Sequence, residues 1–156
     1  MKKRISFLLG VATIMSAMLT SCSKSYNAPP NATTTVDTTL KTQITSGNWI
    51  ISSYTQRTED KTSQFAGVVF TFSSDGTLIA ADKNGNKING TWSFSPSTVG
   101  YYGGPPSKAS ITLNVGVSSP FDRLTKVWNV ASNTATQLKI DNPEPLEDEH
   151  VQFTKQ

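Results

Sequence analysis

The chain has 156 residues and a single cysteine, so it has the length of one domain with a modest core and can form no internal disulfide. Its 14 basic and 11 acidic residues give a formal charge of +3. Three basic residues lie at positions 2–4, in a segment that we expect to be removed, which leaves 11 charges of each sign. This balance argues against nucleic acid and against an anionic surface as partners, because both require a net basic field.

The first 21 residues have the layout of a secretory signal. The basic residues at positions 2–4 precede an apolar run from Ile5 to Leu19, and small residues follow that run. The run has about 15 residues, whereas a membrane-spanning helix needs about 20. We therefore expect a cleaved signal peptide over residues 1–21 rather than a transmembrane anchor.

The sequence Leu19-Thr20-Ser21-Cys22 resembles the signal of bacterial lipoproteins, in which the segment before the cysteine is removed and the cysteine is lipidated. The resemblance implies that the mature chain begins at Cys22 and carries three acyl chains there, palmitate among them. Each buried CH₂ contributes about 0.8 kcal/mol and one chain binds only marginally, so three chains would make the attachment effectively permanent. The alternative is an ordinary cleaved signal followed by an unmodified cysteine.

The residues after the cysteine indicate which membrane face to expect. Ser23 does not resemble an inner-membrane retention signal, and by analogy this favours the outer membrane. No acidic run follows Cys22 of the kind that marks surface export in some Bacteroidota. We therefore expect an outer-membrane lipoprotein that faces the periplasm, and exposure at the cell surface is the alternative.

Residues 22–39 are expected to form the lipidated cysteine and a flexible linker. They are rich in Ser, Thr, Asn and Pro, and such a segment buries too little surface to offset its ordering entropy. A coil of this length would hold a domain about 20–25 Å from the lipid. Thr38 lies in a triplet that resembles the O-glycosylation acceptor of some bacteria of the Bacteroides group; the alternative is a plain Thr-rich linker.

Residues 40–156 form one domain in which nearly all the hydrophobic patterning has a period of two, which is typical of strands. Ser-Asp-Gly and Asn84-Gly85 are turn signals, and the second predicts a two-residue hairpin. Many short strands separated by turns indicate an antiparallel sandwich or barrel. One helical turn is expected over 40–44. The strands are expected at 49–54, 68–72, 77–81, 88–94, 111–115, 124–130, 137–140 and 151–153.

Gly47-Asn48-Trp49 at the start of the first expected strand matches the Gly-x-Trp signature of lipocalins. The phrases FTFSSDGTL at 70–78, INGTWSF at 88–94 and VQFTK at 151–155 resemble the small lipocalin-like lipoproteins of the Bacteroidota. The resemblance implies an eight-stranded antiparallel up-and-down barrel with the tryptophan packed near its closed end. The Thr-Asp-Tyr signature of lipocalins is missing from this sequence.

The lipocalin-like resemblance also implies a membrane-anchored module that binds a small hydrophobic or amphipathic ligand. An eight-stranded barrel is just wide enough to be filled by side chains or to hold one small ligand. The candidate pocket residues therefore have an alternative role as a solid core. They are Trp49, Phe70, Phe72, Trp92 and Trp128.

Tyr101 and Tyr102 lie in a Gly- and Pro-rich loop between the fourth and fifth expected strands. Two adjacent tyrosines on such a loop suit stacking on a sugar or docking a protein partner, since loops on rigid scaffolds often carry function. Packing over the barrel end is the alternative. A structural domain that docks an envelope protein through its loops is accordingly the second functional hypothesis, and the partner is unknown.

No motif points to catalysis. His150 is the only histidine, and the chain has no Gly-x-Ser-x-Gly elbow to accompany it, so we interpret it as a surface residue. The acidic stretch 141–149 suits either a weak Ca²⁺ site or, as we prefer, a solvated hairpin loop. We therefore expect a protein that is not an enzyme and that has no cofactor and no bound metal.

Overall fold

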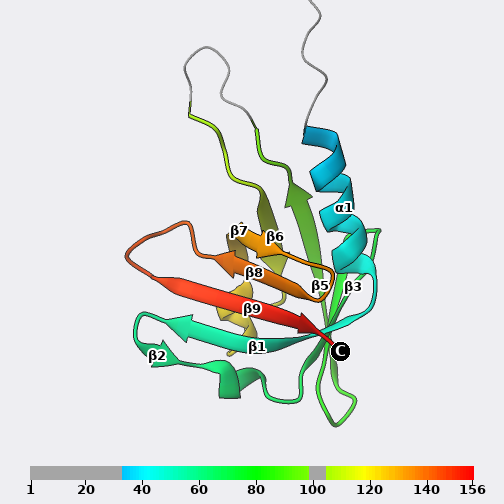
Figure 1. Ribbon diagram of the computed structural model, residues 1–156. Helices are drawn as coiled ribbons and strands as arrows, with labels where there is room; N and C mark the ends of the chain where they lie inside the picture. The colour runs from blue at the N-terminus through cyan, green and yellow to red at the C-terminus, as the bar shows by residue number, and fades with distance from the viewer. Residues whose placement is uncertain (1–32, 99–104) are drawn as a thin grey trace, which may run out of the picture. The chain divides into compact units, whose positions relative to one another are not determined.

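The computed structural model describes residues 33–98 and 105–156 (Figure 1). Residues 31–156 form one compact unit. The described strands and the buried core all lie within that unit, so we treat it as able to fold alone. The expected signal peptide, the lipidation at Cys22 and the pair Tyr101 and Tyr102 lie outside the described residues.

An eight-stranded antiparallel up-and-down barrel confirms the predicted fold. Each strand from β3 to β9 pairs with the next along the chain, and β9 pairs with β1 to close the sheet. The short β2 pairs with the end of β1 and stands outside this circuit. The strands are β1 (Asn48–Gln56), β2 (Glu59–Asp60), β3 (Val69–Phe72), β4 (Thr77–Ala81), β5 (Lys87–Ser95), β6 (Ser110–Asn114), β7 (Lys126–Asn133), β8 (Gln137–Asp141) and β9 (Glu149–Lys155).

Alternate side chains of the strands point inward and fill the barrel. The ring of Phe72 meets those of Trp92 and Phe153 at near right angles, with centroids 5.6 Å and 6.0 Å apart. Such edge-to-face contacts add to the stabilisation that comes from burying the rings. Gly90 faces inward where β5 crosses β6, and a Cβ there would lie 2.2 Å from the carbonyl oxygen of Asn114. The close crossing therefore requires glycine.

Helix α1 (Thr33–Thr45) covers one end of the barrel, which we call the α1 end. Leu40 and Ile44 bury their side chains in the core. The indole nitrogen of Trp49 donates a 2.8 Å hydrogen bond to the carbonyl of Ile44, and the Lys155 ammonium lies 5.4 Å from the Trp49 ring centroid. Trp49 thus packs at a closed end of the barrel. Within the described residues, no helix is both long and apolar enough to span a membrane.

The opposite end is covered by two 3₁₀ turns, η1 (Thr62–Phe65) and η2 (Phe121–Leu124). Strand β1 pairs with β3 through Asn48 and Trp49, and its later part instead pairs with β2. Phe65 fills the space that this divergence leaves, with its ring 5.6 Å from that of Tyr54 and 6.0 Å from that of Phe121. Both ends of the barrel are therefore covered by local structure.

The structure differs from the sequence-based expectation at several elements, and the short β2 and the turn η1 were not expected at all. Helix α1 begins at Thr33, inside the segment expected to be a flexible linker, and is longer than one turn. The loop at Asn84-Gly85 spans 82–86 rather than two residues, because the Asp82 carboxylate accepts hydrogen bonds from the backbone of Asn84 and Asn86. Leu124 ends η2 instead of opening the sixth expected strand.

Candidate functional site

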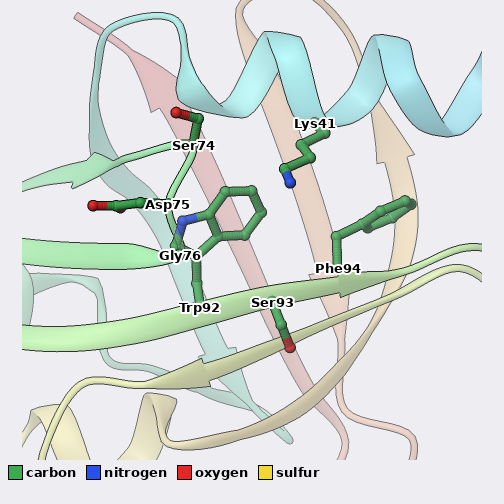
Figure 2. Close-up of a pocket in the computed structure, with 7 residues that line it drawn as sticks. All are labelled: Lys41, Ser74, Asp75, Gly76, Trp92, Ser93 and Phe94. Atoms are coloured by element: carbon green, nitrogen blue, oxygen red, sulfur yellow. The ribbon is translucent and has the colours of Figure 1, made fainter.

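A surface pocket with a volume of about 210 Å³ lies at the α1 end of the barrel (Figure 2). Helix α1, the turn between β3 and β4, and strand β5 form its walls. We call it the rim pocket. Its lining residues are Lys41, Ser74, Asp75, Gly76, Trp92, Ser93 and Phe94.

The turn between β3 and β4 is held in one conformation by its own hydrogen bonds. The amide of Gly76 donates to the carbonyl of Ser73 at 3.1 Å, and the amide of Trp92 donates to the carbonyl of Gly76 at 2.8 Å. Gly76 has a φ of +90°, and a Cβ there would lie 3.2 Å from the Trp92 carbonyl oxygen. Glycine is therefore needed to join this turn to β5.

Two aromatic side chains from β5 form the apolar part of the rim pocket. The Trp92 indole nitrogen donates a 2.9 Å hydrogen bond to the carbonyl of Ser73, which fixes the plane of the ring. Trp92 is 5% exposed, and Phe94, two residues further along the same face, is half-buried. Because the indole N–H is already used, the ring offers the pocket an apolar surface.

Lys41 supplies the positive charge of the rim pocket. Figure 2 shows its side chain reaching from α1 toward the side of the pocket where the rings of Trp92 and Phe94 lie. No partner for its ammonium is found among the described residues. The Asp75 carboxylate points away in this view and accepts a 2.9 Å hydrogen bond from the amide of Thr77. That bond holds the pKa of Asp75 below its usual range.

The five aromatic residues predicted to form a ligand pocket belong to one hydrophobic core, and each is at most 5% exposed. Of these five residues, Trp92 also lines the rim pocket, which opens at the surface. Sequence reasoning missed Lys41 and placed Phe94 only at the end of the strand expected over 88–94. The alternation of Trp92 and Phe94 beside a Ser-Asp-Gly turn was the available signal.

A buried polar cluster lies inside the barrel at the end covered by η1 and η2. Glu149 is 2% exposed. Its carboxylate accepts hydrogen bonds from the hydroxyl of Tyr54 at 2.8 Å, the ammonium of Lys126 at 2.5 Å and the side-chain amide of Asn142 at 2.7 Å. Burial alone would raise the pKa of Glu149, but these three donors outweigh burial and hold that pKa below its usual range. Burial and the neighbouring carboxylate raise the pKa of Tyr54. We call these four residues the Glu149 cluster.

Arg123 from η2 lies beside the Glu149 cluster. One guanidinium nitrogen donates to the side-chain oxygen of Gln56 at 3.2 Å. Its Nε is buried and has no partner among the described residues. Most polar groups of the cluster thus have a hydrogen-bond partner inside the barrel. We interpret the cluster as a network that stabilises the fold.

His150 lies on the outer face of β9 and is exposed, as expected. Its Nδ1 is 2.8 Å from a carboxylate oxygen of Asp141, and its Nε2 is 3.1 Å from one of Asp148. The hydrogen bond to Asp141 contributes most to raising the pKa of His150. Both ring nitrogens are therefore engaged by carboxylates, which is unfavourable for a general base that must accept a proton from a nucleophile.

The acidic loop 142–148 is held by the neighbouring hairpin. The guanidinium of Arg57 donates to the carbonyl of Leu146 at 3.2 Å and 3.3 Å, and the Arg57 amide donates to the carbonyl of Asp148. In the part of the chain that the structure describes, no group of three or more His, Cys, Asp or Glu side chains is arranged to hold a metal ion. The expectation of a solvated loop over 141–149 was wrong at Glu149, which belongs to β9 and is 2% exposed. For the rest of the stretch, the preference for a solvated loop over a Ca²⁺ site remains a prediction.

No family model and no curated protein matches the chain. Among solved structures, one similar chain is a DUF4847 family protein from Bacteroides vulgatus, determined by crystallography at 1.00 Å resolution. The two chains are 17% identical; the match covers 75% of this chain and 99% of that chain, with a TM-score of 0.48. A likeness this distant carries no inference about function.

Proposed function

We propose that this protein is a membrane-anchored envelope lipoprotein whose barrel domain binds a small amphipathic molecule and catalyses no reaction. The observation that carries the proposal is the rim pocket, where two aromatic side chains and one lysine ammonium face the same open volume. An apolar surface with a few convergent polar groups is the usual character of a small-molecule site.

The rim pocket suits this role better than the barrel interior. The aromatic side chains of the interior are nearly fully buried and pack against one another, whereas the rim pocket opens to solvent. Its volume of about 210 Å³ is below the range of about 300–1,000 Å³ that is typical of sites for drug-sized ligands. The ligand is therefore compact, or only part of a larger molecule enters.

The proposed anchor is the lipid on Cys22, in the outer membrane and facing the periplasm. It is supported by the resemblance of residues 19–22 to a lipoprotein signal. Only the residues from 23 to 32 separate Cys22 from the start of α1, and a fully extended chain of that length reaches about 35 Å. The domain would therefore stay close to the membrane surface and sample molecules that partition there.

The location of binding can be tested by NMR on ¹⁵N-labelled residues 31–156 with a small-molecule extract of bacterial envelopes. The chain has three tryptophans, and each gives its own indole N–H signal, so binding near any of them is detected in one spectrum. We expect the Trp92 signal to shift and those of Trp49 and Trp128 to stay in place. Absence of any shift would contradict ligand binding, and shifts of Trp49 and Trp128 would place the ligand in the interior instead.

A paired substitution on β5 gives the matched control. Phe94→Ala removes one wall of the rim pocket, and we expect it to weaken the extract-induced shift of Trp92. Ile88→Ala removes a similarly half-buried side chain from the other end of the same strand, and we expect it to leave the shift unchanged. Equal effects of the two variants would show that general loosening of the barrel, rather than contact at the pocket, governs the signal.

A second candidate function is the docking of an envelope protein. The hairpin between β5 and β6 continues beyond the two strands through a bridge between Thr98 and Ser107, and its exposed sides lead to Tyr101 and Tyr102. Site-specific crosslinking from position 97 in intact cells tests it. A crosslinked partner that is lost in the Tyr101→Ala/Tyr102→Ala double variant would favour docking, and an unchanged crosslinking pattern would argue against a role for the tyrosines.

A further inference from the structure

We propose that the rim pocket selects a carboxylate-bearing ligand, with the carboxylate paired to Lys41 and a flat apolar body resting on Trp92 and Phe94. This inference rests on the proposed function, since it specifies the ligand of the same site. The determining feature is the Lys41 ammonium, which is aimed into the pocket and has no partner among the described residues.

Lys41 differs from the two lysines that lie against other tryptophans. The Lys126 ammonium lies 5.3 Å from the Trp128 ring centroid and is neutralised by Glu149. The Lys155 ammonium lies over Trp49 and donates a 2.9 Å hydrogen bond to the hydroxyl of Ser46. Both of these cations are thus committed to structural contacts. Within residues 33–98 and 105–156, the Lys41 ammonium has no such contact and is available to an incoming anion.

Asp75, the acidic residue in the lining of the pocket, does not compensate Lys41. Asp75 faces away from the pocket in Figure 2, and its carboxylate completes the β3–β4 turn by accepting from the amide of Thr77. An apolar group placed over the ammonium would therefore remove its water contacts without replacing them, which costs free energy, and a neutral acceptor would replace them only with a weaker hydrogen bond. A carboxylate would restore a partner through a charge-assisted hydrogen bond.

The aromatic side chains determine the rest of the ligand. The Trp92 ring is held by its hydrogen bond to Ser73, and the hydroxyl of Ser93 points away from the pocket in Figure 2. Ring carbons of Trp92 and Phe94 therefore form the apolar part of the surface below the ammonium, next to the polar groups of the β3–β4 turn. Such a surface favours an aromatic or short aliphatic body over a polyhydroxylated one, because hydroxyl groups placed there would find few partners.

The test compares 2-naphthoate with 2-naphthamide, which share size and shape and differ in charge. Each is titrated into ¹⁵N-labelled residues 31–156, and the dissociation constant is taken from the indole N–H signal of Trp92. We expect naphthoate to bind about tenfold more tightly than naphthamide. Lys41→Met should abolish this difference by weakening naphthoate alone, whereas Lys41→Arg should retain it.

Lys139→Met is the matched control, because Lys139 is an exposed lysine on β8 outside the rim pocket. It removes the same charge from the protein and should leave both dissociation constants unchanged. A loss of selectivity in Lys139→Met equal to that in Lys41→Met would overturn the proposal in favour of a general charge effect.

The remaining outcomes separate the two proposals. If both probes bind wild-type protein with equal affinity, the choice of a carboxylate is overturned while the proposed ligand site stands. If neither probe moves the Trp92 signal, and an envelope extract does not move it either, the proposed ligand site itself is overturned. If the extract moves it and neither probe does, the carboxylate-bearing aromatic ligand is wrong.

Discussion

The Lys126 ammonium lies 2.5 Å from the Glu149 carboxylate inside the barrel, although the sequence had led us to expect Glu149 in a solvated acidic loop over 141–149. The contact joins the start of β7 to the start of β9, on either side of β8. With Tyr54 and Asn142 it gives a buried carboxylate three donors. This arrangement governs how the stability of the barrel should respond to mutation and pH.

Lys126→Met should destabilise the domain by about 1–3 kcal/mol, because it leaves the Glu149 carboxylate buried with one donor fewer. The free energy of unfolding is measured by urea denaturation of residues 31–156, monitored by tryptophan fluorescence. Lys139→Met removes an exposed lysine and should change the stability little. A Lys126→Met variant as stable as the Lys139→Met control would contradict the role of the pair.

The Glu149 cluster also predicts a loss of stability in acid. Its donors lower the pKa of Glu149, so the stabilisation is fully present above the unfolded value near 4.5 and is lost as the pH falls through the folded pKa. Tyr54→Phe removes one donor and should make this acid dependence shallower. Unfolding is followed at a series of pH values below 5, and identical pH profiles for both proteins would show that the hydroxyl of Tyr54 does not lower the pKa.

His150 predicts the opposite dependence near neutral pH. Its two carboxylate partners raise its pKa, so its contribution is present below the unfolded value of 6.5 and is lost as the pH rises through the folded pKa. The effect is small, since the His150 side chain is 54% exposed. His150→Gln should flatten the stability profile between pH 6 and 8. An unchanged slope there would argue against these contacts in solution.

Trp49→Phe tests the docking of α1. The substitution leaves the buried carbonyl of Ile44 without its donor, and we expect a loss of about 1–3 kcal/mol with faster hydrogen exchange over residues 33–45. Trp128→Phe is the control, because its indole donates to the carbonyl of Leu124 in η2 at the opposite end. That variant should be destabilised without selective exposure of α1. Equal exchange of α1 in the two variants would contradict the assigned contact.

Substitutions at two glycines separate the cost of a steric clash from the cost of an unfavourable backbone conformation. At Gly90 an added Cβ would lie 2.2 Å from the backbone of β6, so Gly90→Ala should cost about 1–3 kcal/mol or prevent folding. At Gly85 nothing lies within 4 Å, and only its φ of +86° disfavours alanine, at about 1–2 kcal/mol. The midpoint temperature of thermal unfolding should be lower for Gly90→Ala than for Gly85→Ala. The reverse order would be incompatible with the close crossing of β5 and β6.

The barrel was predictable because its strands alternate hydrophobic and polar residues, and all eight expected strands are present. The same alternation of hydrophobic and polar residues could have predicted the inward position of Glu149. Counting back from Phe153 and Val151 places Glu149 on the inward face, but its acidic neighbours made it look like part of a loop. Similarly, Lys126 shares the inward face of β7 with Trp128.

Helix α1 and the rim pocket were harder to predict. The residues before Leu40 are mainly threonine, which has weak helix propensity, and the helix is stabilised by the packing of Leu40 and Ile44 on the barrel. Lys41 then lies in the rim pocket only because that packing brings it to β5, far away in the sequence. Tertiary contacts of this kind leave no local pattern in the chain.

The most direct measurement for the central claim is native mass spectrometry of residues 31–156. The protein is purified from bacterial cells and measured before and after incubation with envelope extract. The account predicts a reproducible additional mass that disappears on denaturation and is reduced in Phe94→Ala but retained in Ile88→Ala. A bare protein mass before and after incubation would contradict the claim that this barrel binds a small molecule.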